Sequence, residues 1–164
     1  MQPSADGDDG RDRVVAWIFV LVQLALLAAV FLLPGGSAWT TPAWLSDAAR
    51  ALSVLGLAVV LIGLWTLGRS ATPLPTPVKD GRLRSNGLYR YVRHPIYSGV
   101  LALAIGAAIP SGSVPVAAAA SALVVWLAIK ARWEERRLRA GYAGYASYAS
   151  RTPRFIPWRL GRPD

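Results

Sequence analysis

The sequence contains an apolar run that is long enough to cross a membrane. Residues Val14–Leu33 are apolar except for Gln23. As a helix this run would rise about 30 Å, which matches the hydrocarbon thickness of a bilayer. Of all residues 54% are hydrophobic and 16% are charged, whereas a soluble domain has about 25% charged residues. The chain is therefore predicted to be an all-α integral membrane protein.

Further apolar segments complete a predicted bundle of about four transmembrane helices. The spans are expected at residues 14–33, 51–68, 94–109 and 115–131, and the second can begin as early as Ala43. Residues 1–13 are polar and are expected to form a disordered tail, not a signal peptide. Residues 14–164 are expected to form a single domain, in which the fourth helix continues out of the membrane and a helical C-terminal segment follows.

Small residues predict where the helices approach one another. Gly56 and Gly63 would allow a close contact between the second span and a neighbour. On the third helix small residues recur every four positions, at Ser98, Ala102 and Gly106, and the fourth helix offers Ala118 and Ala122. This pattern predicts a close antiparallel pair of the third and fourth helices.

Basic residues are concentrated near the two ends of the chain and in the loop of residues 70–93, whereas the turn at residues 110–115 has none. Cytoplasmic segments of membrane proteins carry such an excess. We therefore expect both termini and the loop to lie in the cytoplasm, and we expect the protein in the cytoplasmic membrane of a bacterium.

Composition excludes several kinds of site and partner. The chain has no cysteine, so it has no thiolate nucleophile, thiolate metal ligand or disulfide. A single histidine and nine carboxylates, four of them near the N-terminus, argue against a catalytic metal. The net charge of +9 is better explained by anionic lipid than by nucleic acid in so apolar a chain. The expected partners are the bilayer and a lipophilic small-molecule or lipid substrate.

The most informative motif lies where the basic loop becomes the third helix. It holds His94, followed by Pro95, whose fixed φ suits the first turn of a helix. Arg90, Arg93 and His94 would then lie at a helix N-terminus, where free backbone N–H groups favour an anion. The motif can therefore be a cofactor-binding corner, or it can be a basic anchor at the lipid headgroups with tyrosines as an interfacial belt.

Two segments resemble a known family. The segment Gly87–Gly99 resembles the signature of the isoprenylcysteine carboxyl methyltransferase family, which is related to membrane phospholipid methyltransferases. A C-terminal block is also similar: Glu134, Glu135, Leu138, Tyr145, Tyr148, Arg151 and residues 154–157. The resemblance extends over residues 73–157. One departure is Tyr142-Ala143, which stands where the family commonly has Phe-Gly.

The resemblance implies S-adenosyl-L-methionine as methyl donor, bound in a loop at the cytoplasmic boundary of the membrane. The residues that match its site are Gly81, Arg82, Leu83, Arg84, Tyr89, His94, Pro95, Ile96, Tyr97 and Glu134. Lys130 matches a basic position that faces the substrate, and the predicted catalytic set is Lys130, Arg132, Arg151 and Glu135. The implied activity is in-line methyl transfer to a lipophilic substrate, with carboxyl O-methylation as the reaction most like the family's.

Other functions stay open from the sequence. A carboxylate nucleophile is already ionised and needs no base, whereas N-methylation of a phospholipid or small molecule would need one, for which His94 or Glu135 is the candidate. An NADPH-dependent reductase related to sterol reductases is a further alternative. Glu134 and Glu135 could also be surface residues that pair with Lys130 or Arg139 along the helix.

Overall fold

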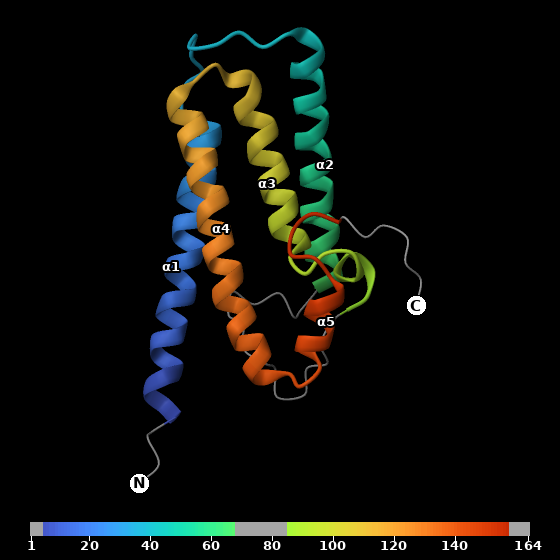
Figure 1. Cartoon of the computed structure of the whole chain (residues 1–164). Helices are drawn as coiled ribbons and strands as arrows, with labels where there is room; N and C mark the ends of the chain where they lie inside the picture. The colour runs from blue at the N-terminus through green and yellow to red at the C-terminus, as the bar shows by residue number, and fades with distance from the viewer. Residues whose placement is uncertain (1–4, 68–84, 158–164) are drawn as a thin grey trace.

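The computed structural model describes residues 5–67 and 85–157, which form an upright helical bundle with a short helix beside one end (Figure 1). The helices are α1 (Ala5–Leu32), α2 (Ala43–Leu67), α3 (Pro95–Ala108), α4 (Val114–Gly141) and α5 (Tyr145–Arg151), with 3₁₀ turns η2 (Gly87–Arg90) and η3 (Ile109–Ser111). The segments Gly10–Leu32, Ala43–Thr66 and Val114–Gly141 are long and apolar enough to cross a membrane, and Pro95–Ser111 is a shorter apolar helix. The prediction of an all-α integral membrane protein is confirmed.

One helix begins earlier than the sequence predicted, and a second begins at the earlier of its two expected starts. The helix α1 starts at Ala5, so residues 5–13 are helical where a disordered tail was expected. An ion pair between Asp12 and Arg137 of α4 holds this part of α1 against the bundle. The helix α2 starts at Ala43, directly after Pro42, and its first turns include an ion pair of 2.5 Å between Asp47 and Arg50. Both helices thus include polar residues that form ion pairs, and a search for apolar runs alone does not detect such residues.

The closest helix contact is between α2 and α3, because glycines bring the two backbones together. A Cβ atom added at Gly99 would lie 2.6 Å from the carbonyl oxygen of Gly56. One at Gly63 would lie 2.7 Å from the side chain of Ile96. The helices α3 and α4 do pack on each other in the core. The predicted contact through their small-residue faces is wrong, since Gly106 of α3 meets Ser53 of α2 and Ala118 and Ala122 of α4 are exposed.

Replacing Gly99 with alanine is expected to destabilise the bundle by about 1–3 kcal/mol, because the new methyl group would force α2 and α3 apart. The midpoint of thermal unfolding in detergent should fall. Gly144→Ala is the matched control, since a Cβ atom there meets nothing within 4 Å. Equal midpoints for the two variants would contradict the close contact.

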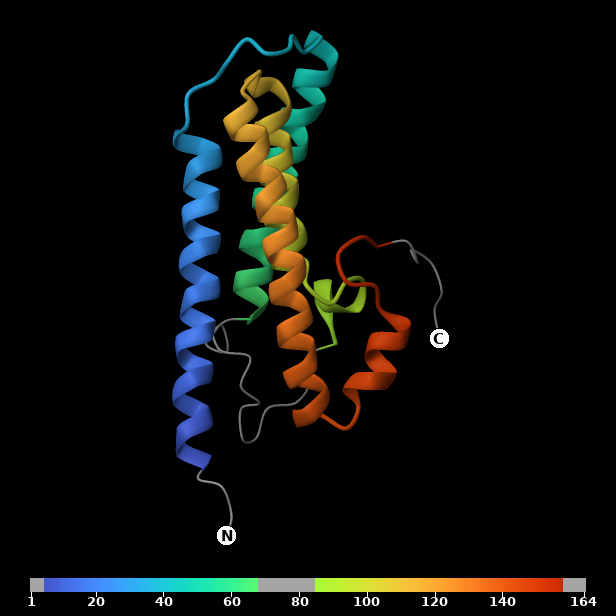
Figure 2. The ribbon, with the colours of Figure 1, turned by 60° about the vertical axis from the view of Figure 1, so that its left-hand side comes forward.

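The bundle places the start of α1, the end of α4 and α5 near one end, as the two views in Figures 1 and 2 show. At the opposite end the α1–α2 connection pairs with the α3–α4 turn, through Gly36 N–H to Ser111 at 2.8 Å and Ala38 N–H to Gly112 at 2.9 Å. Leu123 and Leu127 of α4 are fully buried in the core shared by α1, α3 and α4. Large apolar side chains on α1 and α2 face outward, as lipid contact requires.

Candidate active site

The start of α3 is held by the C-terminal segment, and this arrangement buries His94. Pro95 is the first residue of α3 and His94 precedes it as N-cap. The backbone N–H groups of Arg93 and His94 donate to Pro153 at 2.8 Å and to Arg154 at 3.1 Å. The hydroxyl of Ser98 donates to Phe155 at 2.8 Å. The sequence predicted that N–H groups at this corner bind an anion, but those of Arg93 and His94 are already occupied by residues 153 and 154.

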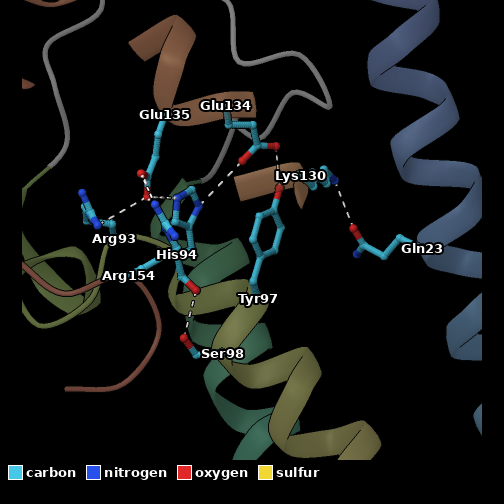
Figure 3. A network of polar contacts seen from close by, with 9 residues as sticks. All are labelled: Gln23, Arg93, His94, Tyr97, Ser98, Lys130, Glu134, Glu135 and Arg154. Carbon is cyan, nitrogen blue, oxygen red and sulfur yellow. Dashed lines mark hydrogen bonds and ion pairs between the residues drawn. The ribbon is translucent and has the colours of Figure 1, made fainter. Parts of the chain in front are cut away.

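Glu135 fixes this corner from α4. Its side chain is 3% exposed and accepts two hydrogen bonds of 2.8 Å from Arg154. His94 Nε2 lies 3.2 Å from the same carboxylate, and an Arg93 nitrogen lies 3.5 Å away. Three basic side chains thus surround one buried carboxylate, which joins α4, the α3 start and the C-terminal segment (Figure 3). A carboxylate held by so many donors is an anchor rather than a proton acceptor for a substrate.

Glu134 points to the other side of His94. Its Oε1 accepts a hydrogen bond of 2.5 Å from the hydroxyl of Tyr97, while Oε2 lies 3.7 Å from His94 Nδ1. The second distance is too long for a hydrogen bond, so Oε2 is the oxygen that a ligand can use. The rings of His94 and Tyr97 are stacked, with centroids 5.2 Å apart and planes 4° from parallel. The Glu134 carboxylate therefore lies beside the stacked rings of His94 and Tyr97.

Lys130 lies one helical turn before Glu134 and is buried, with 5% of its surface exposed. Its Nζ donates to the side-chain oxygen of Gln23 on α1 at 3.0 Å and lies 5.1 Å from the centre of the Tyr97 ring. Among the described residues no carboxylate oxygen lies within 4.0 Å of this nitrogen. A buried ammonium with no carboxylate in direct contact is costly and is therefore a strong candidate for anion binding.

The other predicted site residues are placed less centrally. Pro95 is buried at the start of α3, and Ile96 packs on Gly63. The carbonyl of Tyr89 accepts a hydrogen bond of 2.6 Å from the Tyr148 hydroxyl. Arg132 and Arg151 are exposed, and Arg132 lies roughly 200° around α4 from Lys130. The predicted loop residues Gly81, Arg82, Leu83 and Arg84 lie outside the described residues.

Tyr145 and Tyr148 of α5 pack beneath this corner. Tyr145 is 1% exposed, and burial, followed by the nearby charge of Glu135, raises the pKa of its hydroxyl to about 12. Burial also raises the pKa of Tyr148. Both side chains are therefore neutral near pH 7, and their place in the structure is to pack α5 against the site.

Two contributors to the site, Gln23 and Arg154, were given no role from the sequence, and the role of Arg93 was left open. Gln23 carried a detectable signal, because it is the lone polar residue in an apolar run. Arg154 belonged to the C-terminal block, but no pattern indicated that it binds Glu135. Arg93 was expected either in a cofactor-binding corner or at the lipid headgroups, and its side chain is only 11% exposed. Long-range partners of arginines are not visible in a sequence.

Comparison with known proteins supports a methyltransferase-like arrangement. The family model described as phospholipid methyltransferase matches residues 46–144. The fold is similar to that of the eukaryotic intramembrane Ras methyltransferase, isoprenylcysteine carboxyl methyltransferase, with a TM-score of 0.62 and 20% sequence identity over 95% of this chain. The chain spans about half of that protein, 54% of its length. No curated protein matches the sequence significantly.

Proposed function

Because this chain belongs to the phospholipid methyltransferase family, we propose that it is an integral membrane methyltransferase that uses S-adenosyl-L-methionine to methylate the carboxylate of a lipophilic substrate. One observation carries the choice of a carboxylate: Lys130 is a buried ammonium with no carboxylate of the described residues within 4.0 Å. An acidic substrate would supply a carboxylate in direct contact with this ammonium, whereas a protonated amine would be repelled by it.

The side chains of the site fit the proposed donor. Oε2 of Glu134 can accept hydrogen bonds from an ammonium or a ribose diol. The stacked rings of His94 and Tyr97 offer aromatic surface against an adenine or a cationic sulfonium, with an attraction of about 0.5–2 kcal/mol for the cation. When bound, S-adenosyl-L-methionine supplies an electrophilic methyl group. Gly81, Arg82, Leu83 and Arg84 remain proposed contacts of the donor.

The chain's contribution to the reaction is alignment and exclusion of water. Lys130 would hold the substrate carboxylate, which is ionised near neutral pH and needs no general base. Correct alignment in a dry site can contribute about 7–11 kcal/mol to lowering the barrier. Arg132 and Arg151, being exposed, are better placed at the membrane surface, so the proposal assigns the carboxylate to Lys130.

Calorimetry with S-adenosylhomocysteine tests the cofactor. The detergent-purified protein should bind it, and Glu134→Gln should weaken binding about tenfold to a hundredfold, because a hydrogen bond to a charged group is lost. Arg136→Gln is the matched control, since Arg136 is an exposed residue of the same helix. Absence of binding to the unmodified protein would overturn the proposal, and nicotinamide binding in its place would favour a reductase.

N-methylation of a phospholipid or small molecule is the second candidate, because the matching family is described as phospholipid methyltransferase. An amine must lose a proton before it attacks, and the two nitrogens of His94 already face Glu135 and Glu134. Membranes containing the protein should be incubated with a methyl-labelled donor and treated with base. Carboxyl methyl esters release the label as methanol, whereas N-methyl groups retain it, so retained label would favour the second candidate.

The proposed orientation places the site on the cytoplasmic side. The ends of α1 and α4 that carry Arg11, Arg13, Arg132, Arg136 and Arg139 lie at the same end of the bundle as the site. An excess of arginine on that side agrees with a cytoplasmic location. We propose a bacterial cytoplasmic membrane with both termini inside.

A further inference from the structure

Gln23 lies on the face of α1 that packs against α4. Residues three or four positions apart share one face of a helix, and on this face Ala16, Phe19 and Val30 are buried. The Gln23 amide therefore points into the bundle and not toward lipid, as Figure 3 shows for its contact with Lys130. A polar group in an apolar membrane segment is costly, so its position calls for a functional explanation.

Contacts other than the one at Gln23 also attach α1 to α4. Nearer the end of the bundle, Asp12 pairs with Arg137. The Phe19 ring lies 5.1 Å from Trp126 and 5.3 Å from Trp133, and the Trp126 indole donates to the Phe19 carbonyl at 3.1 Å. Because these contacts already hold the two helices together, the bond from Lys130 to Gln23 is free to serve another purpose.

We infer that Gln23 is a positioning residue for Lys130, and that the two side chains form one carboxylate-binding subsite between α1 and α4. The inference rests on the proposed function and deepens it, because it adds α1 to the substrate site. The family match at residues 46–144 includes Lys130 but does not reach Gln23. The substrate class is an amphiphilic acid whose tail lies among the membrane helices.

The hydrogen-bonding capacity of the pair supports this subsite. An ammonium has three donors on a flexible stem, and one of them is directed at Gln23 Oε1. That bond fixes the direction of the other two. The Gln23 amide nitrogen makes no hydrogen bond within residues 5–67 and 85–157, so its N–H groups can donate beside the ammonium. A carboxylate bound there would accept charge-assisted hydrogen bonds from Lys130 and neutral ones from Gln23.

Two substitutions of Gln23 separate positioning from attachment. Gln23→Leu removes the acceptor and should lower the yield of base-releasable methyl label about tenfold to a hundredfold. Gln23→Glu keeps an oxygen beside Lys130 and strengthens the tie between the helices, yet it places a second carboxylate in the subsite and should lower the yield at least as much. A purely structural role predicts the opposite for Gln23→Glu, namely retained activity. S-adenosylhomocysteine affinity should be unchanged in both variants.

Asp12→Leu is the matched control, because it loosens the same pair of helices without touching Lys130. It should leave the yield within about twofold of the unmodified protein, as expected for a partly exposed ion pair. The inference is overturned if Gln23→Glu keeps full activity, or if Gln23→Leu loses no more than Asp12→Leu.

A spectroscopic readout keeps this test separate from the proposed function. Lys79 and Lys130 are the only lysines in the sequence, so in a Lys79→Arg background labelled lysine gives an NMR side-chain signal from Lys130 alone. That signal should shift in Gln23→Leu and stay in place in Asp12→Leu; an unshifted signal in Gln23→Leu would overturn the inference. Failure of the unmodified protein to bind S-adenosylhomocysteine would instead overturn the proposed function, while the NMR comparison still decides whether Gln23 positions the ammonium.

Discussion

Replacing Glu135 with alanine is expected to destabilise the protein by about 3–5 kcal/mol, because removal of one partner from a buried charge network leaves the others uncompensated. Glu135 is 2% exposed and bonds to Arg154 and His94 while lying 3.5 Å from Arg93. The thermal midpoint in detergent should fall. Limited proteolysis should cut residues 145–157 sooner, since the tie between α4 and this segment is lost.

The neighbouring residue provides the control for Glu135. Arg136→Ala removes an exposed side chain from the same turn of α4 and should change stability by less than about 0.5 kcal/mol. If Glu135→Ala kept the thermal midpoint of the unmodified protein but lost activity, Glu135 would be a catalytic base and its role as an anchor would be rejected.

Replacing Lys130 with methionine is expected to lower the yield of base-releasable methyl label about a hundredfold or more, because the substrate carboxylate would lose its buried partner. The stability of the protein, in contrast to its activity, should not fall. A buried charge exchanged for an apolar side chain of similar length is often neutral or stabilising, so the thermal midpoint should be kept or raised. Loss of activity without loss of stability distinguishes a binding residue from a packing residue.

Arg136→Met is the control for Lys130, since it removes a positive charge from an exposed position of the same helix. It should keep most of the activity. If Lys130→Met retained the full yield of methyl ester, the carboxylate would be held elsewhere, and the exposed Arg132 and Arg151 would return as candidates.

The order of the helices was predictable from the sequence, because each apolar run has to satisfy its backbone hydrogen bonds within a helix. The family resemblance carried by residues 87–99 is confirmed by the match at residues 46–144. Helix pairing was not predictable in the same way. Small residues at Ala102 and Gly106 mark a face of α3 that permits close approach, but they do not identify the neighbour, and that neighbour is α2.

Part of the site was predictable from the sequence, because local helix geometry determines it. Pro95 fixed the start of α3, and the spacing of Lys130 and Glu134 by one helical turn placed both on one side of α4. The partners of Glu135 were not predictable, because they come from residues that are 19 and 41 positions away in the chain. Whether Arg132 and Arg151 face the site depends on the rotation of α4 and α5, which a motif does not specify.

The pairing of residues 153–155 with the beginning of α3 has a consequence for biosynthesis. His94 leaves the ribosome long before Pro153 and Arg154, whose carbonyls complete its surroundings. The nascent chain can therefore insert its hydrophobic helices into the bilayer while this corner is still open. The surroundings of His94 are therefore completed only after residues 153–155 have also been translated and have packed against the start of α3.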